Sequence, residues 1–297
     1  MRPCVEAIRM NKIGLLPNPE KDPDLFYSSR ICEFLVQSGA QVYTSPEFAL
    51  PRTDGVVSVP RADIFSLADC VVTLGGDGTL LRIAHEAARH SKPIMGINFG
   101  KIGYMAELEY NEIEMLSRLL SGQFAIEKRL MLGVRVRRGG RTVFKSIALN
   151  DAVISKGVIA RLIDMHVAAG GDRVSNYRAD GIILSTPTGS TGYSMSAGGP
   201  ILEPSMEAII MTPVCPHSLV ARPIVFSRDA EIAVTLQNLA DKDTYLTIDG
   251  FETLKLRDGD TVEVRRSRSV TRLIKLKNMN FYKILNQKLA TDGEGFI

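Results

Sequence analysis

The sequence has few cysteines, and their spacing excludes a cysteine metal site. The four thiols are Cys4, Cys32, Cys70 and Cys215. No two of them lie within the roughly two to four residues that separate paired ligands in cysteine zinc sites. We therefore expect buried, reduced thiols, as in most cytoplasmic proteins.

Long apolar runs and a large net charge are also missing. No apolar run approaches the roughly 18 residues that cross a bilayer, and Glu6, Arg9 and Lys12 interrupt any signal-peptide pattern. The net charge of only +3 argues against a dedicated nucleic-acid binder. Hydrophobic and charged fractions of 45% and 23% exclude wholesale disorder. We expect a cytoplasmic protein that binds neither membranes nor nucleic acids.

The 297 residues suffice for about two domains, and the hydrophobic pattern changes near residue 122. Before it, apolar runs alternate with helical patterns, which predicts a parallel sheet with covering helices. The expected strands are Lys12–Leu16, Gln41–Thr44, Cys70–Leu74 and Pro93–Asn98. After it, alternation with period two and glycine-rich turns predict mostly β structure. We predict an α/β domain over 1–121, a β-rich domain over 122–275, and a C-terminal segment over 276–297 that docks.

The segment Gly75-Gly76-Asp77-Gly78-Thr79 directly follows one of the expected strands. Glycines at a strand–helix junction let backbone N–H groups approach a phosphate, and the helix N-terminus adds positive partial charge. A carboxylate in such a turn suits a group that takes a proton from an attacking hydroxyl, or one that helps to hold a metal. The alternative is a tight turn in which the glycines serve only backbone geometry.

Apolar residues spaced three and four apart from Leu80 onward predict a helix after this turn, with Thr79 as its N-cap. Arg82 and His85 are expected on the polar side of this helix. His85 and His90 stand about 140° apart around a straight helix, so they cannot share a zinc ion. We assign no metal-ligating residues.

A second unusual segment begins with a short strand after Asp180 and continues as a run of small and hydroxylated residues to Pro200. Such a run supplies flexible backbone and short hydrogen-bonding groups around a polar ligand, although a generic loop has the same composition. Asn150-Asp151 ends a β pattern. At such a place the side chains either face a cleft or form an Asx turn. Arg178 and Asp180 flank the strand, and an exposed ion pair between them is the simple alternative.

Taken together, these segments resemble the NAD kinase family. The matching pieces are GGDGT at 75–79, NFGKIGYM at 98–105, Asn150-Asp151, RADGIILSTPTGSTGYSMSAGGP at 178–200 and HSLVARPIV at 217–225. Their order and spacing agree with the family over almost the whole chain. The first motif alone is shared with diacylglycerol and sphingosine kinases and, more loosely, with phosphofructokinases, whereas the run at 178–200 is far more specific.

The resemblance implies transfer of a phosphoryl group from ATP or polyphosphate, with Mg²⁺, to the 2′-hydroxyl of the adenosine ribose of NAD, giving NADP. It implies an α/β N-terminal domain, a β-rich C-terminal domain and a last segment that returns to the first domain. It also implies a homodimer or homotetramer. The active site is expected in the cleft between the domains, so that neither half works alone.

The resemblance also assigns roles to residues. Asp77 accepts the hydroxyl proton, beside a phosphate turn formed by Gly76, Gly78 and Thr79. Asn150 and Asp151 hydrogen-bond the NAD sugars. The adenine and nicotinamide pockets are lined by Thr191, Gly192, Tyr193, Ser194, Met195 and Ser196. Further binding positions are Arg82, Arg161, Arg178 and Asp180.

Three positions depart from the family pattern. Asp151 stands where a glutamate is usual, Gly192 replaces an alanine, and Phe251 replaces a glutamine and receives no role. Two other functions remain possible from the sequence. One is a diacylglycerol-type lipid kinase that shares the glycine motif, and the other is a catalytically idle NAD-binding sensor.

Overall fold

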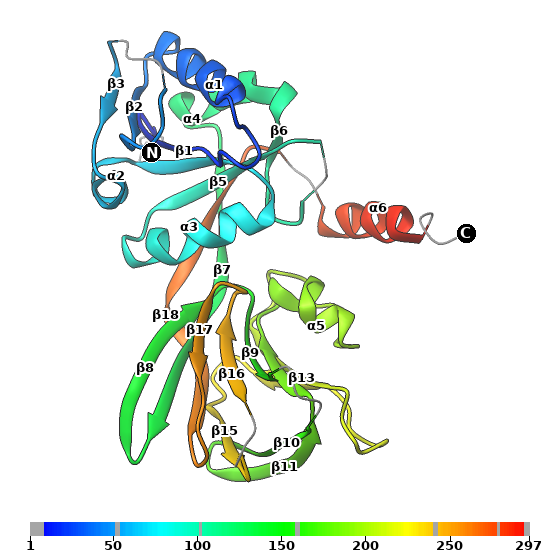
Figure 1. Cartoon of the computed structure of the whole chain (residues 1–297). Coiled ribbons are helices and arrows are strands. Elements are labelled where there is room, and N and C mark those ends of the chain that lie inside the picture. Colours follow the sequence, from blue (N-terminus) through cyan, green and yellow to red (C-terminus); the bar gives the residue numbers. More distant parts are fainter. Residues whose placement is uncertain are drawn as a thin grey trace, which may run out of the picture. The chain divides into compact units, whose positions relative to one another are not determined.

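The computed structural model describes residues 9–50, 54–100, 103–157, 161–239, 243–277 and 280–293 (Figure 1). These residues form two compact units. Unit 1 comprises Met1–Lys128 with Thr271–Ile297, and unit 2 comprises Arg129–Val270. Both limits fall inside long strands, β7 (Ala125–Arg138) and β18 (Thr261–Lys275), whereas the sequence pattern placed them at 121 and 275. No helix in the described residues is long and apolar enough to cross a membrane.

Unit 1 is built on a parallel sheet with the strand order β5-β4-β1-β2-β3. Its strands are β1 (Lys12–Leu16), β2 (Gln41–Thr44), β3 (Val56–Ser58), β4 (Cys70–Leu74) and β5 (Pro93–Asn98). Two further segments pair with β5 in parallel, namely the short strand β6 (Leu108–Glu109) and the C-terminal part of β18. Every residue of β4 is buried, as expected for a parallel strand covered on both faces. The four strands predicted from the apolar runs are confirmed.

The helices of unit 1 are α1 (Phe26–Gln37), α2 (Arg61–Leu67), α3 (Asp77–Arg89), η1 (Tyr110–Leu116), α4 (Ser117–Ser121) and α6 (Phe281–Gly293). Two expectations for α3 are wrong. Its N-cap is Gly76, not Thr79, so that Asp77 occupies the first helical position, where a carboxylate interacts favourably with the helix dipole. His85 is buried rather than on the polar side, because it lies three residues before Ala88 and flanks the apolar stripe.

Unit 2 is a sandwich of two largely antiparallel sheets. One sheet has the order β14-β13-β12-β9-β16-β17. It contains β9 (Asp151–Lys156), β12 (Gly181–Ser185), β13 (Ala208–Val214), β14 (Ile224–Ser227), β16 (Thr244–Ile248) and β17 (Glu252–Lys255). The other contains β7, β8 (Arg141–Ala148), β10 (Ile163–Ala169), β11 (Asp172–Ala179), β15 (Ile232–Gln237) and the first part of β18. Alternate residues of both sheets form one buried cluster between them, as the period-two pattern predicted.

The expectation of buried thiols is correct for two cysteines and wrong for a third. Cys32 and Cys70 are buried, but Cys215 is exposed. Burial, together with the charge of Glu33, raises the pKa of Cys32 to about 11, so that thiol is unreactive at neutral pH. Cys4 lies outside the described residues.

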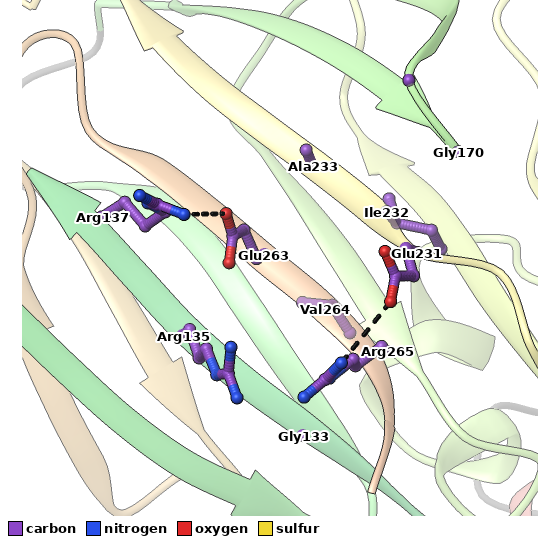
Figure 2. A pocket seen from close by; sticks show the side chains of 11 residues that line it. Gly133, Arg135, Arg137, Gly170, Glu231, Ile232, Ala233, Glu263, Val264 and Arg265 are labelled. Carbon is purple, nitrogen blue, oxygen red and sulfur yellow. Dashed lines mark hydrogen bonds and ion pairs between the residues drawn. The ribbon is translucent and has the colours of Figure 1, made fainter. Parts of the chain in front are cut away.

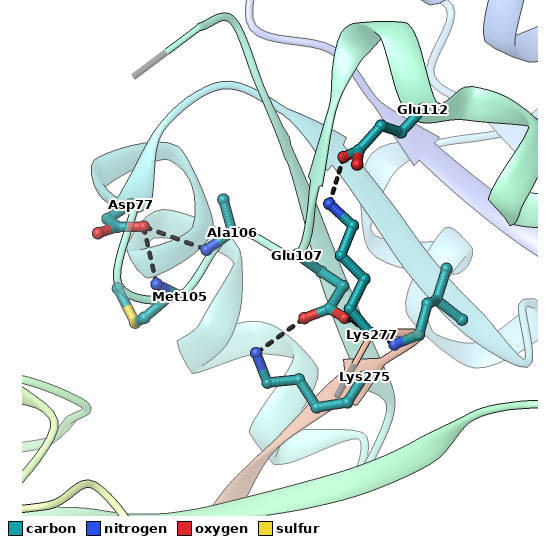
Figure 3. Close-up of polar contacts among 8 residues, drawn as sticks. Asp77, Met105, Ala106, Glu107, Glu112, Lys275 and Lys277 are labelled. Carbon is teal, nitrogen blue, oxygen red and sulfur yellow. Dashed lines mark hydrogen bonds and ion pairs between the residues drawn. The ribbon is translucent and has the colours of Figure 1, made fainter. Parts of the chain in front are cut away.

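The chain returns to unit 1 within β18, and the carboxylate of Glu107 holds the end of this strand there (Figure 3). Glu107 is buried; its Oε1 accepts the backbone N–H groups of Leu276 (2.7 Å) and Lys277 (2.6 Å), and its Oε2 is 2.8 Å from Lys275 Nζ. Arg118 donates a hydrogen bond to the carbonyl of Leu276 at 2.7 Å. The start of the C-terminal segment is therefore fixed to unit 1 by charge-assisted hydrogen bonds.

Replacing Glu107 by glutamine should lower the free energy of unfolding by about 1.5–3 kcal/mol, the usual worth of a hydrogen bond to a charged group. The amide oxygen can still accept both backbone N–H groups, but the amide NH₂ would face the ammonium group of Lys275. Chemical denaturation monitored by circular dichroism measures the loss. The matched control is Glu114→Gln, because Glu114 is exposed on η1. Equal stability of the two variants would remove Glu107 from this anchoring role.

Candidate active site

The glycine turn at the start of α3 is closed by a contact that requires its first glycine. Gly75 has φ = +141°, and a Cβ added there would lie 2.3 Å from Thr79 Oγ1. The same hydroxyl accepts a hydrogen bond from the side-chain amide of Asn18 at 2.8 Å. The turn between β4 and α3 is thus tied to the loop after β1. Sequence reasoning missed Asn18, which it treated only as part of a turn.

The carboxylate of Asp77 faces a neighbouring loop and accepts three consecutive backbone N–H groups, two of which Figure 3 shows. The donors are Tyr104 at 2.8 Å, Met105 at 3.1 Å and Ala106 at 3.2 Å. Gly103 leaves room for this contact, because a Cβ there would lie 2.4 Å from Asp77 Oδ1. A carboxylate has about four acceptor positions, so one remains for a ligand proton.

These hydrogen bonds to Asp77 give a structural role to part of the motif at 98–105. Gly103 is the residue whose lack of a side chain admits the Asp77 carboxylate. Lys101 and Ile102 lie outside the described residues. Of the other residues expected at the turn, Gly78 and Arg82 are exposed on α3, and Gly76 is half-buried. The first four backbone N–H groups of an α-helix have no partner one turn earlier within the helix, which suits an anion.

Unit 2 carries a separate pocket of about 340 Å³. The residues that line it are Asn150, Asp151, Val153, Ser155, Tyr193, Thr247, Asp249 and Gly250. Of the residues predicted to bind NAD, the structure therefore brings together Asn150, Asp151 and Tyr193. Tyr193 is 47% exposed, so it is accessible to a ligand.

Asp249 builds the corner on which Asn150 and Asp151 stand. Its carboxylate accepts the backbone N–H groups of Leu149 (2.8 Å), Asn150 (2.8 Å) and Asp151 (2.9 Å). Asp249 is buried and has φ = +48°, a conformation that aspartate tolerates better than most residues. Sequence reasoning saw only a turn at Asp249-Gly250. The available signal was a carboxylate next to a glycine after an apolar strand.

The negative charge of Asp249 also changes the protonation of Asp151. Burial, reinforced by the charge of Asp249, raises the pKa of Asp151 from its ordinary value of 3.8 to about 7. Near neutral pH the carboxyl of Asp151 is therefore partly protonated and can donate a hydrogen bond.

The Thr186–Gly189 turn packs directly on Asn150. Thr186 donates its backbone N–H to the Asn150 carbonyl at 2.9 Å, and a Cβ on Gly189 would lie 2.2 Å from that oxygen. The side-chain oxygen of Asn150 is buried and has no hydrogen-bond partner among the described residues. An unpaired acceptor of this kind is available to a ligand hydroxyl.

Several predicted residues have partners elsewhere in the protein. Ser194 is buried, and its hydroxyl lies 2.9 Å from that of Thr212. The Thr191 hydroxyl donates to the Thr188 carbonyl at 3.4 Å. Gly192, Met195 and Ser196 continue the η2 (Gly189–Thr191) and α5 (Tyr193–Ser196) segment without lining the pocket. The hydroxyl of Ser194 thus ties this loop to the sheet, and that of Thr191 bonds within the loop.

The suggested ion pair between Arg178 and Asp180 is wrong. Arg178 Nε lies 3.9 Å from Asp164, and Asp180 Oδ1 lies 2.5 Å from Lys156 Nζ. Arg161 is exposed. None of these three lines the pocket around Asn150.

Two protein families match this chain in sequence. The ATP-NAD kinase N-terminal domain matches residues 13–124, and the ATP-NAD kinase C-terminal domain matches residues 149–276. The NAD kinase of Citrifermentans bemidjiense is 39% identical over 283 residues, which are 94% of this chain and 98% of that protein. The chain belongs to the NAD kinase family. Members of the NAD kinase family are phosphotransferases.

Further relatives agree. The NAD kinase of Geobacter sulfurreducens is 46% identical over 228 residues, covering 76% of this chain and 80% of its own length. A crystal structure of an NAD kinase from Archaeoglobus fulgidus in complex with ATP has a TM-score of 0.72 and 26% identity, covering 94% of this chain and 98% of that one. Yeast NADH kinase complexed with NADH shares the fold, with a TM-score of 0.80 at 24% identity over 95% of this chain and 88% of that one. Nothing in these matches favours the lipid kinase or the idle sensor.

The family resemblance implies a magnesium ion. Within the described part of the chain, no three His, Cys, Asp or Glu side chains gather into a metal site. Asp77 itself is engaged by three N–H donors. Mg²⁺ usually keeps several waters and binds through phosphates with only one or two carboxylates. The donor set therefore fits an ion carried mainly by the phosphates of a nucleotide, where it would neutralise their charge.

The raised pKa of Asp151 predicts how stability depends on pH. The folded state holds this proton more tightly than the unfolded state, so the protein loses stability as pH rises from about 4 to about 7. Asp151→Asn abolishes the titration. Its melting temperature relative to wild type should therefore increase between about pH 5 and about pH 8.

Melting curves at several pH values, recorded by circular dichroism, measure this trend. Asp172→Asn is the control, because Asp172 is exposed at the start of β11. A melting-temperature difference for Asp151→Asn that stays constant across the range would mean that Asp151 titrates as an ordinary carboxyl.

Proposed function

We propose that this chain transfers the γ-phosphoryl group of ATP to the 2′-hydroxyl of the adenosine ribose of NAD, giving NADP. The observation that carries the proposal is the Asp77 carboxylate, fixed at the start of α3 beside the glycine turn in a chain that matches NAD kinases along most of its length. The phosphoryl donor is a molecule with a chain of linked phosphates. Inorganic polyphosphate is therefore the alternative donor to ATP.

In this proposal, the 2′-oxygen of the ribose attacks the γ-phosphorus of ATP while Asp77 accepts the hydroxyl proton. The bond between the γ-phosphorus and the bridging β-phosphate oxygen breaks, and ADP leaves. The three N–H donors of residues 104–106 fix the direction of the carboxylate before substrate arrives. The amide groups at the start of α3, with Gly76, Gly78 and Thr79, offset the charge of the transferred group. Phosphoryl transfer depends mainly on such positioning and charge neutralisation.

Unit 2 would bind the NAD sugars and a base. The unpaired side-chain oxygen of Asn150 would accept a hydrogen bond from a sugar hydroxyl, and the protonated carboxyl of Asp151 would donate one. The exposed ring of Tyr193 would stack on a base. Asp249 would position both sugar-binding residues through their backbone. Both units therefore contribute residues to the reaction.

The remaining predicted positions keep a proposed binding role. Arg82 and Arg161 are exposed cations that would meet phosphates. Within the described part of the chain, the exposed Arg178 side chain has one long ion pair, to Asp164, so it can reorient toward an anion. Asp180 is held by Lys156 and would help to fix that corner of the sheet. We also propose, on the family resemblance, a cytoplasmic homodimer or homotetramer that uses Mg²⁺.

The direct test is product analysis after incubating the purified protein with NAD, ATP and Mg²⁺, with polyphosphate and diacylglycerol in parallel reactions. NADP should form from ATP. In Asp77→Asn the fold and NAD affinity should persist, because the amide oxygen still accepts two N–H groups, while kcat falls by about 10²–10⁴-fold. Asp63→Asn, the first-turn aspartate of α2, is the control. Wild-type turnover in Asp77→Asn would overturn the role of Asp77 as the base.

Tyr193→Ala tests the base-binding role of the ring. A lost aromatic–base contact costs about 1–3 kcal/mol, so the KM for NAD should rise roughly one to two decades with a smaller effect on kcat. Tyr193→Phe should retain most of the affinity, because only the ring face is used. Steady-state kinetics at saturating ATP measures both. An unchanged KM in the alanine variant would leave Tyr193 as a cover for its loop.

A further inference from the structure

Unit 2 has a second hollow, of about 410 Å³, that the proposed reaction does not use (Figure 2). It lies over β7, β18 and β15 and is lined by three arginines, Arg135, Arg137 and Arg265, with the carboxylates Glu231 and Glu263. Two residues without long side chains, Gly133 and Ala233, form part of its floor.

This hollow lies on the opposite outer face of the sandwich from the pocket around Asn150. In β7, Val134 belongs to the core between the two sheets, so its neighbour Arg135 faces outward. In β9, Ile154 belongs to the same core, and its neighbour Val153 lines the other pocket. The hollow is therefore a distinct surface of unit 2.

The positive charges in the hollow are only partly compensated. Arg137 lies 3.7 Å from Glu263, and Arg265 lies 3.5 Å from Glu231, so both pairs are longer than a good hydrogen bond. The side chains in both pairs are well exposed, and such pairs contribute little to stability. Arg135 has no ion pair among the described residues. Arg137 also donates a hydrogen bond to the Gly140 carbonyl at 2.9 Å. Arg135 and the loosely paired Arg265 are therefore the guanidinium groups best placed to engage another anion.

Two of the arginines come from neighbouring strands. Strands β7 and β18 pair, and a Cβ on Gly133 of β7 would lie 3.6 Å from the Cα of Ser267 on β18. Arg135 of β7 and Arg265 of β18 both line the hollow, and Figure 2 shows their guanidinium groups extending into the same space. Like charges on neighbouring strands repel each other, and a bound anion would remove that repulsion.

We propose that this hollow binds a phosphorylated small molecule, with Arg135 and Arg265 gripping its phosphate oxygens. The planar guanidinium fork matches phosphate geometry, and the volume lies in the usual range for a small-molecule site. The flanking carboxylates of Glu231 and Glu263 would repel a long polyanion or an anionic membrane. The site is independent of the proposed reaction, and its ligand need not be NAD or ATP.

The test uses isothermal titration of the full chain with inorganic pyrophosphate at low salt. The glycine turn before α3 offers a second place for this probe, so variants must separate the two. Arg135→Gln should weaken one binding component by about tenfold, the cost of a lost charge-assisted contact. Arg141→Gln, at an exposed position of the same hairpin outside the hollow, should bind as wild type does. No pyrophosphate binding, or equal binding by Arg135→Gln and wild type, would overturn the proposal.

Melting curves without ligand give an independent check. Arg135→Gln should raise the melting temperature at low salt, because it removes the repulsion with Arg265, and the gain should shrink as salt is added. Arg141→Gln should change little. A lower melting temperature for Arg135→Gln would show that Arg135 supports the fold instead. A change in its native mass by light scattering would show a contact between copies of the chain. Either result would overturn the proposal.

Discussion

Carboxylates that accept consecutive backbone N–H groups fix the position of three loops of this protein. Asp77 accepts three such groups in unit 1, Asp249 accepts three in unit 2, and Glu107 accepts two from the returning chain. Each carboxylate fixes a loop that has no regular secondary structure of its own. Charged acceptors are stronger than neutral ones, so they define these loops more sharply than turn propensity alone.

The same interaction shapes the surroundings of the two aspartates to which we assign roles, Asp77 and Asp151. At Asp77, three donors orient the carboxylate and leave one acceptor position for a substrate proton. Beside Asp249, burial and the charge of that carboxylate raise the pKa of Asp151 to about 7. The carboxyl of Asp151 can therefore donate a hydrogen bond near neutral pH, whereas for Asp77 we propose the role of proton acceptor.

Much of the fold follows from local pattern. The apolar runs Lys12–Leu16 and Cys70–Leu74 became parallel strands with the expected limits, because buried strands leave few alternatives. The start of α3 was predicted less well, since the helix begins at Asp77 rather than after Thr79. The helix dipole favours a carboxylate at the first helical position. The backbone groups that bind this carboxylate, at 104–106, lie on another loop, so the local sequence does not reveal them. The roles of the predicted site residues remain proposals.

The sequence by itself determined the strand–turn–helix unit, the β-rich second half and the clustering of glycines and hydroxyls that marks the family. Tertiary structure alone decided which polar groups are free for a ligand. Ser194 pairs with Thr212, whereas the side-chain oxygen of Asn150 keeps no partner in the described part of the chain. Asp249 reaches Leu149 across 100 residues. Periodicity records contacts within a few residues along the chain, so pairings over such separations, and the protonation states that depend on them, arise only when the sheets pack.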